Sequence, residues 1–194
     1  MNPVLVTVVN NILENTMEIS TAGRLVPQKN HALLIEAIAL VAKKYPEIQC
    51  NIYGEGELRW KLEQIIQEHN LKKNVHLLGN KTDINKWIAQ SSIFVLSSEY
   101  EGLSNALVEA MMLGKACITT DYPGANEVIE NGKNGIVVPR GDCTRLSEAI
   151  ELLLNNENTR KYLSENAKKT SAIYQPLRVI QAWEFLIQKI VKKQ

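Results

Sequence analysis

Two glutamates, Glu101 and Glu109, are the residues of this sequence whose type and spacing point most directly to chemistry. Seven residues separate them, and an apolar stretch at Ile93–Leu96 leads into the glycine turn beside the first. A strand that feeds a polar turn and then a helix start forms an anion site, because free backbone N–H groups and the helix dipole point outward there. Carboxylates on both sides suit hydroxyl groups. The pattern therefore predicts a ligand with phosphates in its middle and hydroxyl groups at both ends, which is the shape of a nucleotide-sugar.

The turn and helix start between the glutamates supply the groups that would face the phosphates. Gly102 lets the backbone approach a ligand closely, and Ser104 or Asn105 can cap the helix. The backbone N–H groups from Leu103 to Ala106 are then free for a diphosphate. We therefore expect this segment to be the phosphate-binding element of the site.

The two glutamates take different positions relative to that element. Glu109 lies one turn inside the predicted helix, where its carboxylate can accept hydrogen bonds from both hydroxyls of a ribose. Glu101 lies on the loop side, within reach of a sugar at the other end of the ligand. The alternative interpretation is that Glu101 is exposed and Glu109 only favours the helix N-terminus.

Arg24 and Lys29 are the cations of the loop at residues 23–30, which follows the first predicted strand. Ligands of open parallel sheets bind at the carboxyl ends of the strands, so this loop leaves the sheet on the ligand side. A guanidinium donates bidentate hydrogen bonds to phosphate, and an ammonium adds a mobile point charge. Two solvated loop cations would be the commoner interpretation of this loop alone. Beside the segment with the two glutamates, phosphate binding is favoured.

Two further loops at the same edge carry weaker signals. Gly54-Glu55-Gly56 follows the second predicted strand, but it lacks the spacing of the GxGxxG dinucleotide motif. Asn80 and Lys81 follow the third strand and could frame a nucleobase, or they are turn residues before a helix cap at Thr82. Gly54, Asn80 and Lys81 complete the set of predicted binding residues.

Apolar periodicity alternates between strand and helix patterns along most of the chain. Strands are predicted at Glu18–Gly23, Ile48–Tyr53, Val75–Leu78, Ile93–Leu96, Ala116–Thr120 and Gly135–Val138. Helices are predicted between them at Asn30–Lys44, Gly56–Asn70, Thr82–Gln90, Asn105–Leu113 and Ala125–Glu130. The alternation predicts a doubly wound, Rossmann-like α/β domain with a mainly parallel sheet of about six strands. Asn30 is the expected cap of the first helix.

After the last strand the pattern contains only helices, which form a C-terminal helical tail at Asp142–Leu154, Glu157–Ala172 and Leu177–Lys192, the last opened by Pro176. We therefore expect a linker or first segment at residues 1–17, a nucleotide-sugar-binding domain at residues 18–175 and an amphipathic helix at residues 176–194. That helix has an apolar stripe of Leu177, Ile180, Trp183, Ile187 and Ile190. Packing on its own domain is the favoured interpretation, and contact with another domain or a membrane surface is the alternative.

Composition excludes several classes of protein. The 194 residues, 45% hydrophobic and 22% charged, suit one large globular domain. A net charge of +1 gives no reason to expect nucleic acid as a partner. Three widely spaced cysteines form no ligand pattern, so we expect neither a disulfide framework nor a metal site, and we place the protein in the cytoplasm. No apolar run has the length of a membrane span.

Six motifs in order, each weak by itself, together resemble a known family. They are Gly23-Arg24-Leu25 with Lys29, Tyr53-Gly54-Glu55-Gly56, Val75–Gly79, the Glu101 and Glu109 pair, Gly124 with Glu127, and Asn131-Gly132-Lys133-Asn134-Gly135. With these motifs the chain resembles the C-terminal, donor-binding domain of the family 4 (group 1) retaining glycosyltransferases, which have the GT-B architecture. The resemblance covers about Ser20 to Asp142, and the helical tail is compatible with it.

The resemblance implies a role for each of the charged residues. Arg24 and Lys29 would hold the donor diphosphate, Glu109 would bind ribose, and Glu101 would contact the transferred sugar as the catalytic residue of this chain. It also implies that no metal ion or other cofactor is needed, because two cations and a helix N-terminus can neutralise the leaving diphosphate. Leu103-Ser104-Asn105 departs from the commoner Phe-Pro sequence, as in polysaccharide-assembly enzymes, and this leaves the donor sugar open.

Enzymes of this family have a second, acceptor-binding N-terminal domain, which is missing from this sequence, and residues 1–4 resemble the linker that follows it. We therefore expect the donor-binding half of a hexosyltransferase that uses a nucleotide-diphosphate sugar, in particular a UDP-sugar, and a glycan or lipid-linked acceptor, with retention. Because the reaction centre lies between the domains, the chain alone should bind donor and transfer little or nothing.

The expected partners are the nucleotide-sugar, the missing domain and no nucleic acid. For the full-length enzyme, peripheral association with the inner face of the membrane is a further expectation. Two other functions stay open at this point: a non-catalytic nucleotide-binding or partner-docking module, and a fragment of a nucleotide-sugar epimerase.

Overall fold

The computed structural model describes residues 15–191, and its centre is a six-stranded sheet. The strands are β1 (Asn15–Ala22), β2 (Gln49–Tyr53), β3 (Val75–Gly79), β4 (Ser91–Leu96), β5 (Ala116–Thr120) and β6 (Ile136–Val138). They lie in the order β3-β2-β1-β4-β5-β6, and every neighbouring pair is parallel. The order reverses between β1 and β4, which is where ligand crevices form in doubly wound sheets. The predicted Rossmann-like α/β fold is confirmed.

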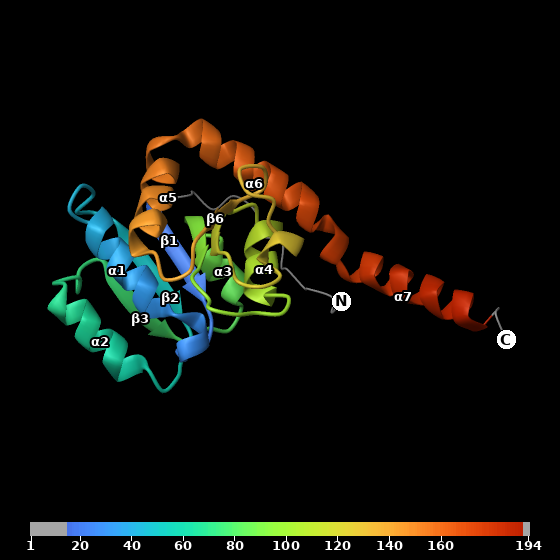
Figure 1. Cartoon of the computed structure of the whole chain (residues 1–194), viewed down its shortest axis with the longest axis horizontal. Helices are drawn as coiled ribbons and strands as arrows, with labels where there is room; N and C mark the ends of the chain where they lie inside the picture. The colour runs from blue at the N-terminus through green and yellow to red at the C-terminus, as the bar shows by residue number, and fades with distance from the viewer. Residues whose placement is uncertain (1–14, 192–194) are drawn as a thin grey trace.

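Helices cover both faces of the sheet (Figure 1). One face carries α1 (His31–Val41), α2 (Arg59–Glu68) and α5 (Cys143–Asn155). The other face carries α3 (Ile84–Ile88), α4 (Asn105–Met112) and α6 (Glu157–Ser171). Single 3-10 turns lie at η1 (Pro27–Lys29), η2 (Ala125–Glu127) and η3 (Ala172–Tyr174). Each of the first four strands therefore ends in a loop that leads to a helix or a 3-10 turn.

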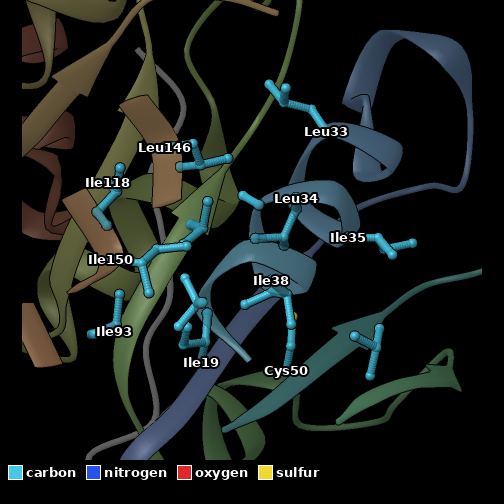
Figure 2. Close-up of a cluster of buried hydrophobic side chains, with 14 of the residues drawn as sticks. Ile19, Leu33, Leu34, Ile35, Ile38, Cys50, Ile93, Ile118, Leu146 and Ile150 are labelled. Carbon is cyan, nitrogen blue, oxygen red and sulfur yellow. The ribbon is translucent and has the colours of Figure 1, made fainter. Parts of the chain in front are cut away.

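Burial on both faces explains the apolar runs Ile93–Leu96 of β4 and Ala116–Ile118 of β5, although both strands also contain buried serines or threonines. All six residues of β4 are buried. Figure 2 shows Ile19 of β1 and Ile93 of β4 packed against Ile38 of α1 and Ile150 of α5. Each such side chain stabilises the fold by about 1.5–3 kcal/mol. This core fixes the strand ends, and with them the loops that follow.

Most predicted elements are found within a few residues of their expected ends. β5 spans the predicted residues, and β1 begins three residues before the predicted Glu18, so part of the predicted first segment belongs to the sheet. The expected Asn30 cap is confirmed, because its side chain accepts a hydrogen bond from the Leu33 N–H at 3.3 Å. The predicted linker at residues 1–4 lies outside the described residues.

Two predicted helices are shorter than expected. The helix predicted at Thr82–Gln90 reduces to α3, and the cap predicted at Thr82 is wrong, because the N-cap residue is Asp83 and it makes no capping hydrogen bond. The φ of 54° at Asp83 is left-handed, so the chain turns there instead of entering the helix earlier. The helix predicted at Ala125–Glu130 is only η2.

The last helix, α7 (Pro176–Val191), extends away from the rest of the domain (Figure 1). Pro176 opens it as predicted. The residues of the apolar stripe are 49–75% exposed, while Val179 near the helix start is buried. Packing of the stripe on its own domain is therefore wrong. Between residues 15 and 191, no helix combines the length and apolarity that crossing a membrane requires.

Candidate functional site

The predicted site residues lie at one edge of the sheet, where the parallel strands end. They come from four segments: residues 23–30 after β1, residues 54–58 after β2, residues 80–83 after β3, and the stretch from residue 97 into α4 after β4. Because β1 lies between β2 and β4, these segments are neighbours although they are far apart in sequence. The rule that ligands bind at the carboxyl ends of parallel strands selects this edge as the candidate site.

Four predicted residues line one pocket of about 360 Å³: Arg24, Gly54, Asn80 and Lys81. Its volume falls within the range of small-molecule sites. Lys81 Nζ lies 4.9 Å from the ring centroid of Trp87, a cation–π contact, and the Trp87 ring centroid lies 6.3 Å from that of Tyr53, which also lines the pocket. Sequence reasoning missed Trp87, because its place beside Lys81 depends on how α3 packs.

Glycines bring the β1 and β2 loops together and so shape this pocket. Gly54 has a φ of 140°, and a Cβ there would lie 2.0 Å from the carbonyl oxygen of Gly23. A Cβ on Gly56 would lie 2.4 Å from the carbonyl oxygen of Leu25. The Leu25 N–H donates to the carbonyl of Glu55 at 2.9 Å, which completes the contact. The glycines are therefore required for backbone packing at the pocket wall.

Glu101 is held by three side chains from the two central loops. Lys29 Nζ lies 2.5 Å from Glu101 Oε1, and the Ser98 hydroxyl donates to the same oxygen at 2.8 Å. Gln28 Nε2 lies 3.4 Å from the other oxygen, Oε2. The Glu101 side chain is only 9% exposed, so the interpretation of an exposed glutamate is wrong. The Lys29 side chain also passes beside Gly23, which links the ion pair to the pocket wall.

Further hydrogen bonds join the β1 and β4 loops around that ion pair. The Ser97 hydroxyl donates to the carbonyl oxygens of Lys29 and Asn30 at 3.1 and 3.0 Å. The Glu99 N–H donates to the carbonyl of Gln28 at 2.9 Å, and the Asn30 amide donates to the Glu99 carboxylate. Sequence reasoning missed Gln28 and the serines, although the serines directly follow β4 at its carboxyl end and that position was an available signal.

Glu109 lies one turn inside α4 and is half-buried. Burial raises the pKa of its carboxyl group above the ordinary value. Among residues 15–191, no hydrogen bond or ion pair involves its side chain. A half-buried carboxylate without a partner keeps its capacity to accept from hydroxyl groups. The predicted ribose contact is compatible with this position and stays a prediction.

The start of α4 keeps its backbone donors free, but without the predicted side-chain cap. Ser104 occupies the N-cap position, yet its hydroxyl makes no capping bond and is buried without a partner in the described part of the chain, so a cap by Ser104 or Asn105 is wrong. The first intrahelical bond runs from the Val108 N–H to the Ser104 carbonyl. The N–H groups of residues 105–107, Ala106 included, therefore have no partner within the helix. Gly102 and Leu103 before them are exposed.

A buried histidine lies at the base of the β1 loop and was not predicted. His31 is the first residue of α1 and is 3% exposed. Within the described residues, neither ring nitrogen has a hydrogen-bond partner of good geometry, although the backbone of Gly23 and Arg24 is close enough to favour the protonated ring. Burial outweighs this and lowers the pKa of His31 to about 4. The imidazole is therefore neutral at pH 7.

Other features of the molecule do not add to this site. A second hollow of about 630 Å³ lies at the opposite edge of the sheet, lined by residues such as Lys43, His69 and Cys143. In the described part of the chain, no three His, Cys, Asp or Glu side chains cluster as ligands of a metal ion. Most of the predicted charged residues thus form two groups side by side, the pocket around Arg24 and the ion pair of Lys29 with Glu101. The predicted residues from Gly102 to Ala106 and Glu109 belong to neither group and lie just before and within the first turns of α4.

Comparison with known proteins identifies the family. The family described as Glycosyl transferases group 1 matches residues 8–170. This chain belongs to that family. The group 1 glycosyltransferase chain is 29% identical over 171 residues to the poly(glycerol-phosphate) alpha-glucosyltransferase of Bacillus subtilis, covering 88% of this chain and 25% of that protein. It is 34% identical over 136 residues to the poly(ribitol-phosphate) alpha-N-acetylglucosaminyltransferase of Staphylococcus aureus, covering 70% and 28%.

Solved structures agree with the family. A mutant of Staphylococcus aureus TarM, in complex with UDP, Fondaparinux and alpha-GlcNAc-glycerol, superposes with a TM-score of 0.84 at 28% identity, covering 93% of this chain and 38% of that one. The C-terminal domain of a group 1 glycosyltransferase from Francisella tularensis has the same fold, with a TM-score of 0.76 at 24% identity, covering 82% and 86%. The group 1 glycosyltransferase chain thus spans about a quarter to a half of the curated relatives it matches.

Proposed function

We propose that this chain is the donor-binding part of a glycosyltransferase that moves a hexose from a UDP-sugar to a glycan or lipid-linked acceptor with retention. The observation that carries the proposal is the arrangement at the strand ends: a pocket lined by Arg24 and Lys81 beside the buried ion pair of Lys29 with Glu101. The cations and the free helix N–H groups suit the diphosphate in the middle of a nucleotide-sugar, and the carboxylates of Glu109 and Glu101 suit the ribose and the sugar at its two ends.

In this arrangement each group has a chemical task. Arg24 and Lys81 attract the diphosphate, and the free N–H groups of α4 add donors that suit the charge on the leaving group. Glu109 accepts from the ribose hydroxyls, and Glu101 accepts from the sugar. Because these groups can neutralise a diphosphate, we propose that donor binding does not depend on a metal ion.

Two further observations support a UDP-sugar as the donor and retention as the stereochemical outcome. The TarM structure contains UDP, and the two relatives described above have names that specify alpha-linked transfer. Since common UDP-hexoses carry an alpha linkage to the phosphate, an alpha product corresponds to retention. All the relatives compared are glycosyltransferases, so an epimerase receives no support from them.

The chain represents only part of the length of these relatives, and transfer is therefore proposed for the whole enzyme. We expect the chain alone to bind donor without transferring the sugar. A non-catalytic binding module would show the same donor binding but no transfer when the complete protein is supplied with acceptor. We also propose that the complete protein associates with the inner face of the membrane.

Calorimetry of the chain with UDP, GDP and ADP tests the proposal. We expect UDP to bind with a Kd below roughly 1 mM, more tightly than GDP or ADP, and equally in EDTA and in Mg²⁺. Arg24→Ala should weaken UDP and flatten its salt dependence, because one phosphate contact is lost. Arg145→Ala is the matched control, since Arg145 is exposed on α5 and pairs with Glu148. Absence of UDP binding, or equal loss in both variants, would refute the assignment.

A further inference from the structure

Two residues without a role in the proposed donor site, Gln28 and Ser98, determine where the Glu101 carboxylate lies. The Ser98 hydroxyl donates to Glu101 Oε1 at 2.8 Å, and Ser98 is fully buried. Gln28 Nε2 donates to the carbonyl oxygen of Tyr100 at 2.8 Å and lies 3.4 Å from Glu101 Oε2. Gln28 therefore restrains both the backbone before Glu101 and one oxygen of its side chain.

These contacts matter because a glutamate does not orient its own carboxylate. The last torsion of a Glu side chain has a broad energy profile, so neighbouring donors set the plane of the carboxylate. Oε1 already accepts from Lys29 and Ser98, whereas within the described residues Oε2 has one long contact, to Gln28. An ionised carboxylate offers about four acceptor positions. The free acceptor capacity of Glu101 is therefore concentrated on Oε2.

The ion pair also fixes the position of the Glu101 carboxylate, and it uses only one of the hydrogen-bond donors of Lys29. An ammonium has three donors, and one is directed at Glu101 Oε1, so the others stay available to a phosphate. With the side chains of Lys29 and Glu101 only 15% and 9% exposed, water has limited access to compete. The arrangement places a cation for the phosphate and an acceptor for the sugar next to each other.

We propose that Gln28 and Ser98 are positioning residues that present Glu101 Oε2 to a hydroxyl of the donor sugar. This inference rests on the proposed donor site. It adds that Oε2 is the oxygen that contacts the sugar and that Gln28 and Ser98 orient the carboxylate. The two residues act through Glu101, so their loss should affect recognition of the sugar and leave recognition of the nucleotide largely intact.

Gln28→Leu and Ser98→Ala test this by calorimetry with UDP, UDP-glucose and UDP-N-acetylglucosamine. The measured quantity is the sugar preference, defined as the Kd for UDP divided by the Kd for the tighter UDP-sugar. Each variant should lower the sugar preference by about three- to tenfold, the effect of losing one hydrogen bond of ordinary strength, while the Kd for UDP changes by less than about twofold. Circular dichroism checks that each variant is folded.

Two control variants match the changes in size and burial. Gln49→Leu removes a glutamine on β2 whose side chain contacts His76, and Ser147→Ala removes a buried hydroxyl on α5 that donates to the Thr144 carbonyl. Both should leave the sugar preference unchanged.

The possible results separate this inference from the proposed function. If the unchanged chain does not bind UDP, both fail. If UDP binds but no UDP-sugar binds more tightly, or if Gln28→Leu and Ser98→Ala keep the full preference, the proposed function stands and the positioning role is wrong. A parallel loss of UDP and UDP-sugar affinity would also overturn it, because the residues would then shape the whole pocket.

Discussion

Acidification should destabilise this fold through one side chain, His31. Its ring is buried at the start of α1, and burial lowers the pKa of His31 to about 4 from the ordinary value of 6.5. The positive charge of Lys29 acts in the same direction. Between these two pH values the unfolded chain binds a proton on this ring and the folded chain does not. Stability conferred by the neutral ring is therefore complete above pH 6.5 and is lost as the pH falls toward 4.

The pKa difference sets the size of the effect. Lowering the pKa of His31 from 6.5 to about 4 corresponds to roughly 3–4 kcal/mol, at about 1.4 kcal/mol for each pKa unit. At pH 5 about 2 kcal/mol of this is already lost. This loss is a large fraction of the free energy of unfolding, which is about 5–15 kcal/mol for a typical domain, so a denaturation experiment can detect it.

Urea denaturation followed by circular dichroism at pH 7.5 and pH 5 measures this loss. His31→Gln should lose about 2 kcal/mol less than the unchanged chain between the two pH values, because its side chain does not titrate. His69→Gln is the control, since His69 is exposed at the end of α2. If the unchanged chain and His31→Gln lose equal stability, the buried neutral ring is not the cause and the reasoning fails.

Two other residues give predictions of different kinds. Glu109→Gln should weaken UDP binding by about 1–3 kcal/mol. Burial raises the pKa of Glu109, so on acidification the unchanged chain should lose more UDP affinity than the variant, in which only the phosphate of UDP itself takes up a proton. Calorimetry across pH measures both losses, and equal losses in the two proteins would contradict this. Gly54→Ala should reduce the free energy of unfolding by roughly 2–4 kcal/mol, because its Cβ meets the Gly23 carbonyl. Gly102→Ala, whose Cβ meets nothing within 4 Å, should change it by less than about 0.5 kcal/mol, and equal losses in urea denaturation would refute the packing argument.

The fold and the pocket could be predicted because both follow from element order. Parallel strands that are covered on both faces carry apolar runs, so β5, which begins with Ala116–Ile118 and is buried throughout, could be located between polar turns. Once strands alternate with helices, the carboxyl ends of β1, β2 and β3 converge, and this alone predicts that Arg24, Gly54, Asn80 and Lys81 line one pocket.

The contacts of Glu101 could not be predicted in the same way. Gln28 and Ser98 contribute to the site only because the register between β1 and β4 places their loops against each other, and register depends on packing of the whole sheet. The cap at Thr82 failed for a related reason. Local propensity favours a threonine at a helix start, but the left-handed turn at Asp83 moves the start of α3 by two residues.

The ion pair of Lys29 with Glu101 changes the electrostatics that an approaching donor meets. The cations predicted for the site are Arg24, Lys29 and Lys81, and of these the charge of Lys29 is already balanced inside the protein. For the proposed donor site we therefore expect long-range attraction of a diphosphate to depend on Arg24 and Lys81, and Lys29 to act only at contact distance. The rate of donor association should thus be set by the pocket, and the discrimination among donors by the buried pair beside it.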